Sequence, residues 1–132
     1  MTSGHRTSSI VNRLRNLCDY AGCVPTSPPP SPAPDPVDFV EAATTFAMLA
    51  TPTRVRILWL LAHGERDVTS LAEATGATVP TVSQHLAKLR LAGLVIVRPE
   101  GRHQIYRVED PHIIALVNQA VEHHQDLRSR TR

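Results

Sequence analysis

After residue 36, apolar side chains recur along most of the chain at the spacing of an α-helix. A helix has about 3.6 residues per turn, so positions three, four and seven apart lie on the same face. Three of the predicted helices carry proline in their first turn, where no backbone N–H is needed, and Thr51, Thr78 and Asp110 can cap them. A fourth, shorter helix can be capped by Asp67 or Thr69. The pattern predicts five helices, over residues 37–49, 52–62, 69–74, 79–90 and 111–127.

The helix over residues 79–90 has two chemically different faces. Its apolar stripe consists of Val79, Val82, Leu86 and Leu89. The other face carries hydroxyl, amide, imidazole and ammonium groups. Such groups suit base edges and phosphates in a DNA major groove, although a solvated surface helix shows the same pattern. A short helix and a turn containing Gly76 precede it, so the two helices form a predicted helix-turn-helix. The polar face carries Thr81, Ser83, Gln84, His85 and Lys88.

A period of two replaces the helical period after Gly93. Residues 94–97 are apolar and β-branched, residues 99–101 have turn chemistry, and residues 103–108 alternate between the two sides. This pattern predicts a β-hairpin whose tip carries Arg98 and Arg102, and a basic tip can lie along the DNA backbone. The predicted fold class is therefore mainly α with a β-hairpin, a winged helix-turn-helix.

Composition divides the chain into two parts. Seven of the 11 prolines fall within residues 25–36, so residues 1–36 are expected to be a leader and a flexible linker before the domain of residues 37–132. With 42% hydrophobic and only 4% aromatic residues, the core must consist of aliphatic side chains, and the net charge of +2 permits nucleic acid as a partner. No apolar run approaches the roughly 20 residues of a membrane span. We therefore expect a cytoplasmic protein in which Cys18 and Cys23 are reduced thiols.

The last helix carries four metal-ligand side chains, two at each end: Asp110 and His112, then His123 and Asp126. The two histidines are on nearly the same face but about 16 Å apart along the axis, so one ion cannot touch both. An antiparallel copy of the helix would bring opposite ends together, which predicts a homodimer with two equivalent intersubunit sites. Imidazole and carboxylate donors suit tetrahedral Zn(II). Ni(II) or Co(II) would require further ligands, for which His124, Gln125 and His5 are candidates.

Four segments together resemble the ArsR/SmtB family of winged-helix metalloregulators: residues 49–58, residues 82–89, Gly93-Leu94-Val95, and Gly101-Arg102 before Tyr106. The resemblance covers residues 37–127 and implies a homodimeric repressor that leaves its operator when an inducer binds. It further implies that Ser83 and Gln84 contact bases, with Thr81, Lys88 and Arg102 in support. The ligand spacing in the last helix resembles that of the family's zinc sensors. Residues 68–75 lack the cysteines of the family's other metal site.

These observations favour a metal-responsive repressor of double-stranded operator DNA over two alternatives. The first alternative is a winged-helix regulator that responds to oxidation of Cys18 and Cys23 or to a partner protein. A second is a zinc hydrolase, but four ligands would close the metal site and the sequence shows no nucleophile or base motif. We therefore expect no enzymatic activity. The competing interpretation of the last helix is that Asp110 is only an N-cap and that the histidines are solvated.

Overall fold

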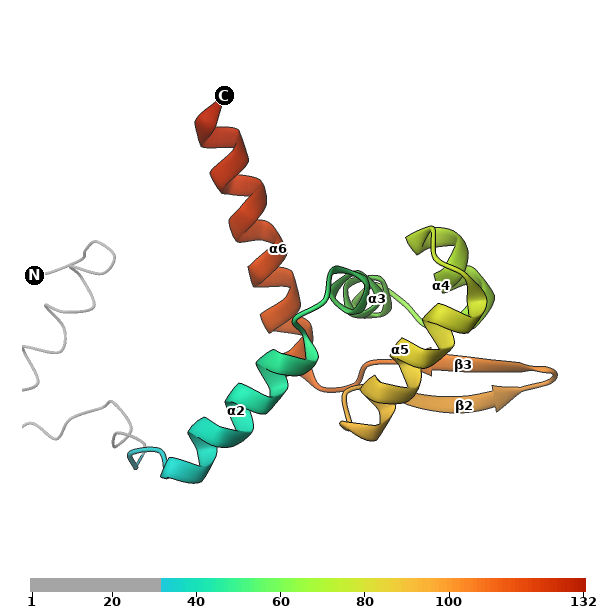
Figure 1. Cartoon of the computed structure of the whole chain (residues 1–132), viewed down its shortest axis with the longest axis horizontal. Helices are drawn as coiled ribbons and strands as arrows, with labels where there is room; N and C mark the ends of the chain where they lie inside the picture. The colour runs from blue at the N-terminus through green and yellow to red at the C-terminus, as the bar shows by residue number, and fades with distance from the viewer. Residues whose placement is uncertain (1–31) are drawn as a thin grey trace, which may run out of the picture. The chain divides into compact units, whose positions relative to one another are not determined.

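Residues 32–132, which the computed structural model describes, form five helices and three strands (Figure 1). Seven of these elements correspond to predicted ones, and one short strand was not predicted. Residues Asp35–Arg132 form one compact unit. The leader, the Cys18 and Cys23 pair and most of the proline-rich linker lie outside the described residues. In chain order the elements are α2 (Pro36–Met48), α3 (Pro52–Ala62), β1 (Arg66–Asp67), α4 (Val68–Thr75), α5 (Val79–Leu91), β2 (Ile96–Glu100), β3 (His103–Arg107) and α6 (Pro111–Thr131).

The core lies around α3, which packs against α4, α5 and the first half of α6. It is aliphatic, as the low aromatic content requires, and this burial is the main favourable contribution to folding. The predicted fold class, mainly helical with a β-hairpin wing, is confirmed. The buried apolar side chains are Ile57, Leu58, Leu61, Leu71, Ala72, Val82, Leu86, Leu89, Leu94, Val95, Ile113 and Val117.

Three helices begin at the side-chain caps that their sequences predict. Asp67, rather than Thr69, caps α4 by accepting a 2.8 Å hydrogen bond from the backbone N–H of Ser70. Thr78 caps α5 and Asp110 caps α6. Thr51 stands at the N-cap position of α3, but its hydroxyl makes no capping bond and its Oγ1 is buried without a hydrogen-bond partner among the described residues. The prediction that the Thr51 side chain caps α3 is therefore wrong, although the helix begins where expected.

The two helices of the helix-turn-helix are α4 and α5. Gly76 ends α4 with φ of +74°, a left-handed conformation that glycine adopts without a steric penalty, and its N–H donates to Ala72 O at 2.9 Å. Three residues of the expected apolar stripe of α5 are fully buried: Val82, Leu86 and Leu89. The fourth, Val79, is 42% exposed because the first turn of α5 extends past the core.

A three-stranded antiparallel sheet forms the wing, with strand order β1-β3-β2. The two-residue strand β1 was not predicted, because its strand identity depends on pairing Arg66 and Asp67 with β3. Leu94 and Val95 are core residues that precede β2 rather than belonging to it. The hairpin turn comprises Gly101 and Arg102, later than predicted. Pro99 belongs to β2, where an edge strand tolerates the missing N–H.

Two helices extend away from this centre. Figure 1 shows α2 and the outer part of α6 projecting from the region of α3 in different directions. No residue of α2 is buried, and its exposed apolar side chains include Phe39 and Phe46, 64% and 57% exposed. Only the first half of α6 contributes to the core, through Ile113 and Val117. None of the helices in the described range is long and apolar enough to cross a membrane.

Candidate nucleic-acid interface and metal centre

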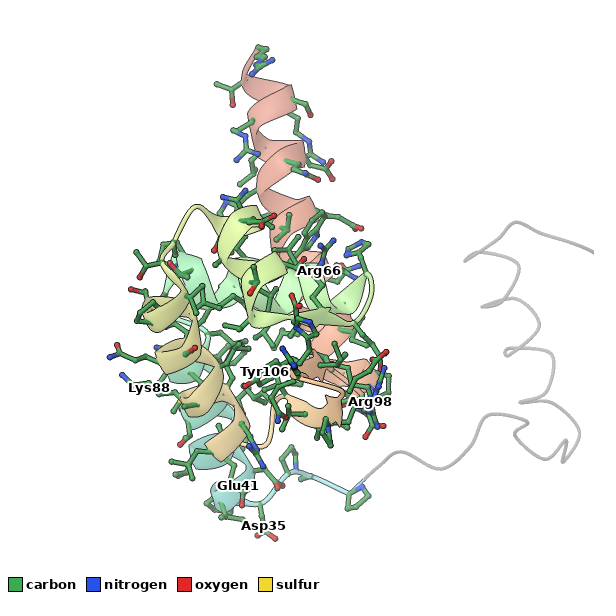
Figure 2. All side chains as sticks on the ribbon, turned by 90° about the vertical axis from the view of Figure 1, so that its right-hand side faces the viewer. Asp35, Glu41, Arg66, Lys88, Arg98 and Tyr106 are labelled. Carbon is green, nitrogen blue, oxygen red and sulfur yellow. The ribbon has the colours of Figure 1, made fainter. Side chains whose placement is uncertain are left out.

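The solvent-facing side of α5 carries the polar groups that the sequence assigned to DNA contact. Thr81, Ser83, Gln84 and Lys88 are all exposed. Lys88 projects away from the molecule in Figure 2. Because Val82, Leu86 and Leu89 anchor the opposite side of α5 in the core, these polar groups are held on a rigid support. A helix presented in this way can place hydroxyl, amide and ammonium groups against base edges and phosphates.

The start of α5 adds a hydroxyl donor to this surface. The hydroxyl of Thr78 accepts from the Thr81 N–H at 3.3 Å and donates to the Thr81 hydroxyl oxygen at 2.9 Å. Thr81 consequently keeps its own hydroxyl hydrogen for an external acceptor. The N-terminus of a helix also favours anions such as phosphate.

His85 is less accessible than its neighbours on α5. It is half-buried, and its Nδ1 atom is enclosed and has no hydrogen-bond partner in the described part of the chain. Burial, followed by the nearby positive charges of Arg54 and Lys88, lowers the pKa of His85. In the free protein these surroundings therefore disfavour the charged form of the His85 ring.

The two arginines expected at the wing tip differ in their surroundings. Arg102 lies in the hairpin turn, is exposed, and makes no ion pair within residues 32–132. Arg98 lies on β2, where it contacts Glu65 at 2.7 Å and Glu100 at 2.9 Å. Both carboxylates raise the pKa of the Arg98 guanidinium through hydrogen bonds. The tip that can reach DNA therefore carries Arg102, and the expectation of Arg98 at the tip is corrected.

The two residues of the first half of the predicted metal site contact each other. Asp110 Oδ1 accepts from the His112 backbone N–H at 2.8 Å and lies 3.1 Å from His112 Nδ1. These hydrogen bonds, the backbone bond first, lower the pKa of Asp110. Both side chains are exposed at the start of α6. A carboxylate and an imidazole thus stand side by side, a donor pair that suits Zn(II).

The second half lies far along the same helix. His123 and Asp126 lie on the outer part of α6, where residues 122–132 are all exposed. Eleven positions separate His112 from His123, which corresponds to about 16 Å along the axis. A single chain therefore does not bring the four predicted ligands together, and no group of three or more metal-binding side chains is present within residues 32–132.

An apolar hollow of about 600 Å³ separates α3 from the outer part of α6. Its apolar lining includes Leu49, Val55, Trp59 and Val121. Arg56 is the cation among its lining residues. This surface was not predicted from the sequence, because it depends on how α6 crosses α3. Concave, mostly apolar surfaces of this kind are typical of sites that bind another molecule.

Comparisons with known proteins agree with this geometry. Residues 51–97 match the family described as bacterial regulatory protein, arsR family. The transcriptional regulator KmtR of Mycobacterium tuberculosis is 48% identical over 92 residues, covering 70% of each chain. A cadmium resistance regulatory protein, a CadC homologue of Staphylococcus aureus, is 32% identical over 91 residues, covering 68% of this chain and 75% of its own. The homodimeric winged helix-turn-helix DNA-binding domain of a possible ArsR-family regulator from Mycobacterium bovis matches with a TM-score of 0.61 and 34% identity, covering 73% of this chain and 88% of that domain.

Proposed function

Since this chain belongs to the ArsR family of bacterial transcriptional regulators, and not to a family of enzymes, we propose that it is a homodimeric, metal-responsive repressor. In this proposal the apo dimer binds operator DNA, and Zn(II) releases it, with Ni(II) and Co(II) as the alternative signals. Its place of action is then the bacterial cytoplasm, where the chromosome lies. The observation that carries the metal assignment is the Asp110 and His112 pair at one end of α6, with His123 and Asp126 at the other.

DNA binding is assigned to α5 and the wing. The exposed Ser83 and Gln84 would contact base edges, and Thr81 and Lys88 would support them. His85 belongs to the same surface through its accessible edge. Arg102 in the hairpin turn would contact the DNA backbone. A dimer presents two such surfaces, so the operator is expected to be a palindrome with half-sites about one helical turn apart.

Dimerisation is assigned to the surfaces that one chain leaves uncovered. Helix α2 exposes Phe39 and Phe46 and contacts the core only through its partly buried end at Met48, although a helix of this length is marginal in water without packing. The hollow between α3 and α6 is apolar as well. A second copy would cover both, and the homodimeric domain from Mycobacterium bovis supports this arrangement for a relative with 34% identity.

The metal ligands proposed are Asp110 and His112 of one chain with His123 and Asp126 of the other. An antiparallel arrangement of the two α6 helices joins opposite ends, which compensates for the separation of about 16 Å within each helix. The donor set fits the metal, because imidazole and carboxylate groups are ordinary Zn(II) ligands. The cadmium-related relative does not imply a cysteine site on α4 here, since residues 68–75 contain no cysteine.

Release from DNA would follow from the position of the ligands. Metal joins the ends of the two α6 helices, and each α6 packs against α3, which in turn packs against α5. Fixing α6 against its partner therefore constrains the separation of the two α5 helices, and a separation unsuited to the operator lowers affinity. Thermodynamic linkage requires that DNA weaken metal binding by the same factor.

The experiment is a titration of the full-length protein onto fluorescent DNA taken from upstream of its own gene, with and without Zn(II), Ni(II) and Co(II). We expect one of these ions to weaken DNA binding by about 10- to 100-fold, the usual range of allosteric coupling. His112→Ala and His123→Ala should each abolish the effect while leaving apo binding intact. His63→Ala is the matched control, because His63 is an exposed histidine at the C-cap of α3, outside α6, and its Nδ1 atom lies 2.7 Å from Trp59 O.

DNA affinity that is unchanged by all three ions would contradict the metal-responsive function. A metal effect that survives in both α6 variants would instead place the metal elsewhere. Replacing Cys18 and Cys23 with serine then tests the thiol alternative, because loss of the response in that variant would favour it. Absorption spectra with Co(II) distinguish a tetrahedral site from one with more ligands.

A further inference from the structure

One face of the wing sheet is covered by ionised side chains. Arg98 and Asp67 both lie opposite Ile105 of β3, from β2 and β1 respectively, so they point to the same side of the sheet. Tyr106 occupies the other face of β3 and borders a hollow beside α5. Figure 2 shows Tyr106 beside α5 and Arg98 farther from that helix. The ionised face is therefore not the face that packs on α5.

Glu65 connects the two long strands of the wing through this face. Its Oε1 atom is 2.7 Å from Arg98 Nη2 on β2, and its Oε2 atom is 3.9 Å from Arg107 Nε on β3. Arg98, before the other interactions, lowers the pKa of the Glu65 carboxyl, so the carboxylate stays ionised at neutral pH. Glu65 itself belongs to neither strand, since it lies between α3 and β1. One carboxylate thus ties β2 and β3 to the segment that leads into the helix-turn-helix.

A second acid in the same segment connects the far end of β3 to α4. Asp67 Oδ2 is 3.2 Å from Nδ1 of His103, the first residue after the hairpin turn. The other oxygen of Asp67 accepts from the Ser70 N–H and caps α4. The segment Glu65–Asp67 therefore contacts the wing at both ends and the first helix of the helix-turn-helix. Besides these contacts, β2 is held by its pairing with β3 and by the residues that follow α5.

We propose that Glu65 is a positioning residue for DNA recognition, which fixes the orientation of the wing relative to α5. The inference rests on the DNA-binding function proposed above. When the wing is fixed, Arg102 reaches the backbone at the same time as Ser83 and Gln84 reach the bases. When the wing is free, simultaneous contact costs conformational entropy, and the freed Arg98 adds a positive charge without sequence preference. Glu65 accordingly favours sequence-specific over nonspecific binding.

The test compares Glu65→Gln with Glu100→Gln in the full-length protein. Each substitution removes one negative charge that contacts Arg98, so the two variants have the same net charge. They differ because Glu100 lies on the same strand as Arg98, whereas Glu65 bridges separate segments. Exposed ion pairs contribute little to global stability, so both variants are expected to fold, and thermal unfolding followed by circular dichroism verifies this.

The readout is the affinity for upstream DNA and for scrambled DNA of equal length. For Glu65→Gln we expect affinity for upstream DNA to fall roughly 3- to 10-fold, the scale at which networked residues couple, while affinity for scrambled DNA stays equal or rises. Glu100→Gln should bind both DNAs as tightly as the wild type or slightly more tightly. Backbone amides of β2 should exchange hydrogen faster in Glu65→Gln, with those of α5 unchanged.

Equal behaviour of the two variants would overturn the positioning role, because charge alone would then explain the effect. Unaltered specificity in Glu65→Gln would overturn it as well. A wild-type protein that does not distinguish upstream from scrambled DNA would overturn the repressor function and, with it, this inference. A wild type that prefers upstream DNA but ignores metal would overturn only the metal response, and the comparison of the two variants would still decide the role of Glu65.

Discussion

His85 differs from the other polar residues of α5 in how it meets solvent. Helical spacing placed it on the polar face with Gln84 and Lys88, and the structure encloses its Nδ1 atom near Arg54 of α3. Spacing within one helix gives the direction of a side chain, but not which residue of another helix approaches it. The same limit applies to Arg98, whose ion pair with Glu65 joins positions 33 residues apart.

The lowered pKa of His85 predicts a pH dependence of stability. An unfolded histidine titrates near pH 6.5, so in acid the unfolded chain binds a proton at this site that the folded chain excludes. The free energy of unfolding should therefore decrease as pH falls below about 6.5. We expect His85→Gln to reduce this decrease, measured by urea unfolding between pH 7.5 and 5.5. His124→Gln, which replaces an exposed histidine of α6, is the control; an equal slope in His85→Gln and wild type would contradict the assignment.

At the scale of elements, local signals predicted the helices better than the strands. Caps such as Asp67 and Thr78 act within one turn, so sequence spacing suffices to find them. Strand β1 has only two residues and exists through its pairing with β3, so no local pattern could reveal it. The hairpin turn was placed too early because Pro99 usually marks a turn, whereas here it occupies an edge strand.

The turn between α4 and α5 gives a prediction at this scale. Gly76 has φ of +74°, and a Cβ atom there would meet nothing within 4 Å. Gly76→Ala should therefore destabilise the domain only through backbone strain, by about 1 kcal/mol. Gly76→Asn should cost less, because asparagine tolerates this conformation better. Thermal unfolding of the two variants measures the difference, and equal losses would show that the strain is not the cause.

At the scale of the whole molecule, the uncovered apolar surface is the main feature. One chain leaves Phe39 and Phe46 of α2 exposed and separates the two pairs of α6 ligands. The sequence could predict which residues would form a metal site, because ligand type and spacing are local properties. Their assembly could not be observed in one chain, since the proposed site requires residues from two.

The proposed dimer predicts the effect of a substitution on α2. Phe46→Ser should weaken dimerisation by about 2 kcal/mol, the usual contribution of a buried aromatic side chain, and should weaken DNA binding with it. Sedimentation velocity at several concentrations measures the change in dimer population. Leu91→Ser is the matched control, because Leu91 is an apolar side chain that is 91% exposed on α5, a helix that the proposal does not assign to the dimer surface. A Phe46→Ser protein that remains as dimeric as wild type would exclude α2 from the interface.

The absence of any buried residue in α2 has a consequence for how the gene must be expressed. In the proposed dimer, the packing that stabilises α2 is supplied by another copy, so its order depends on protein concentration. When few copies are present, the abundance of the DNA-binding form increases with the square of the copy number, and single chains with an uncovered α2 are the ones exposed to proteases. DNA binding would then depend steeply on the concentration of the regulator, in addition to any signal that the regulator detects.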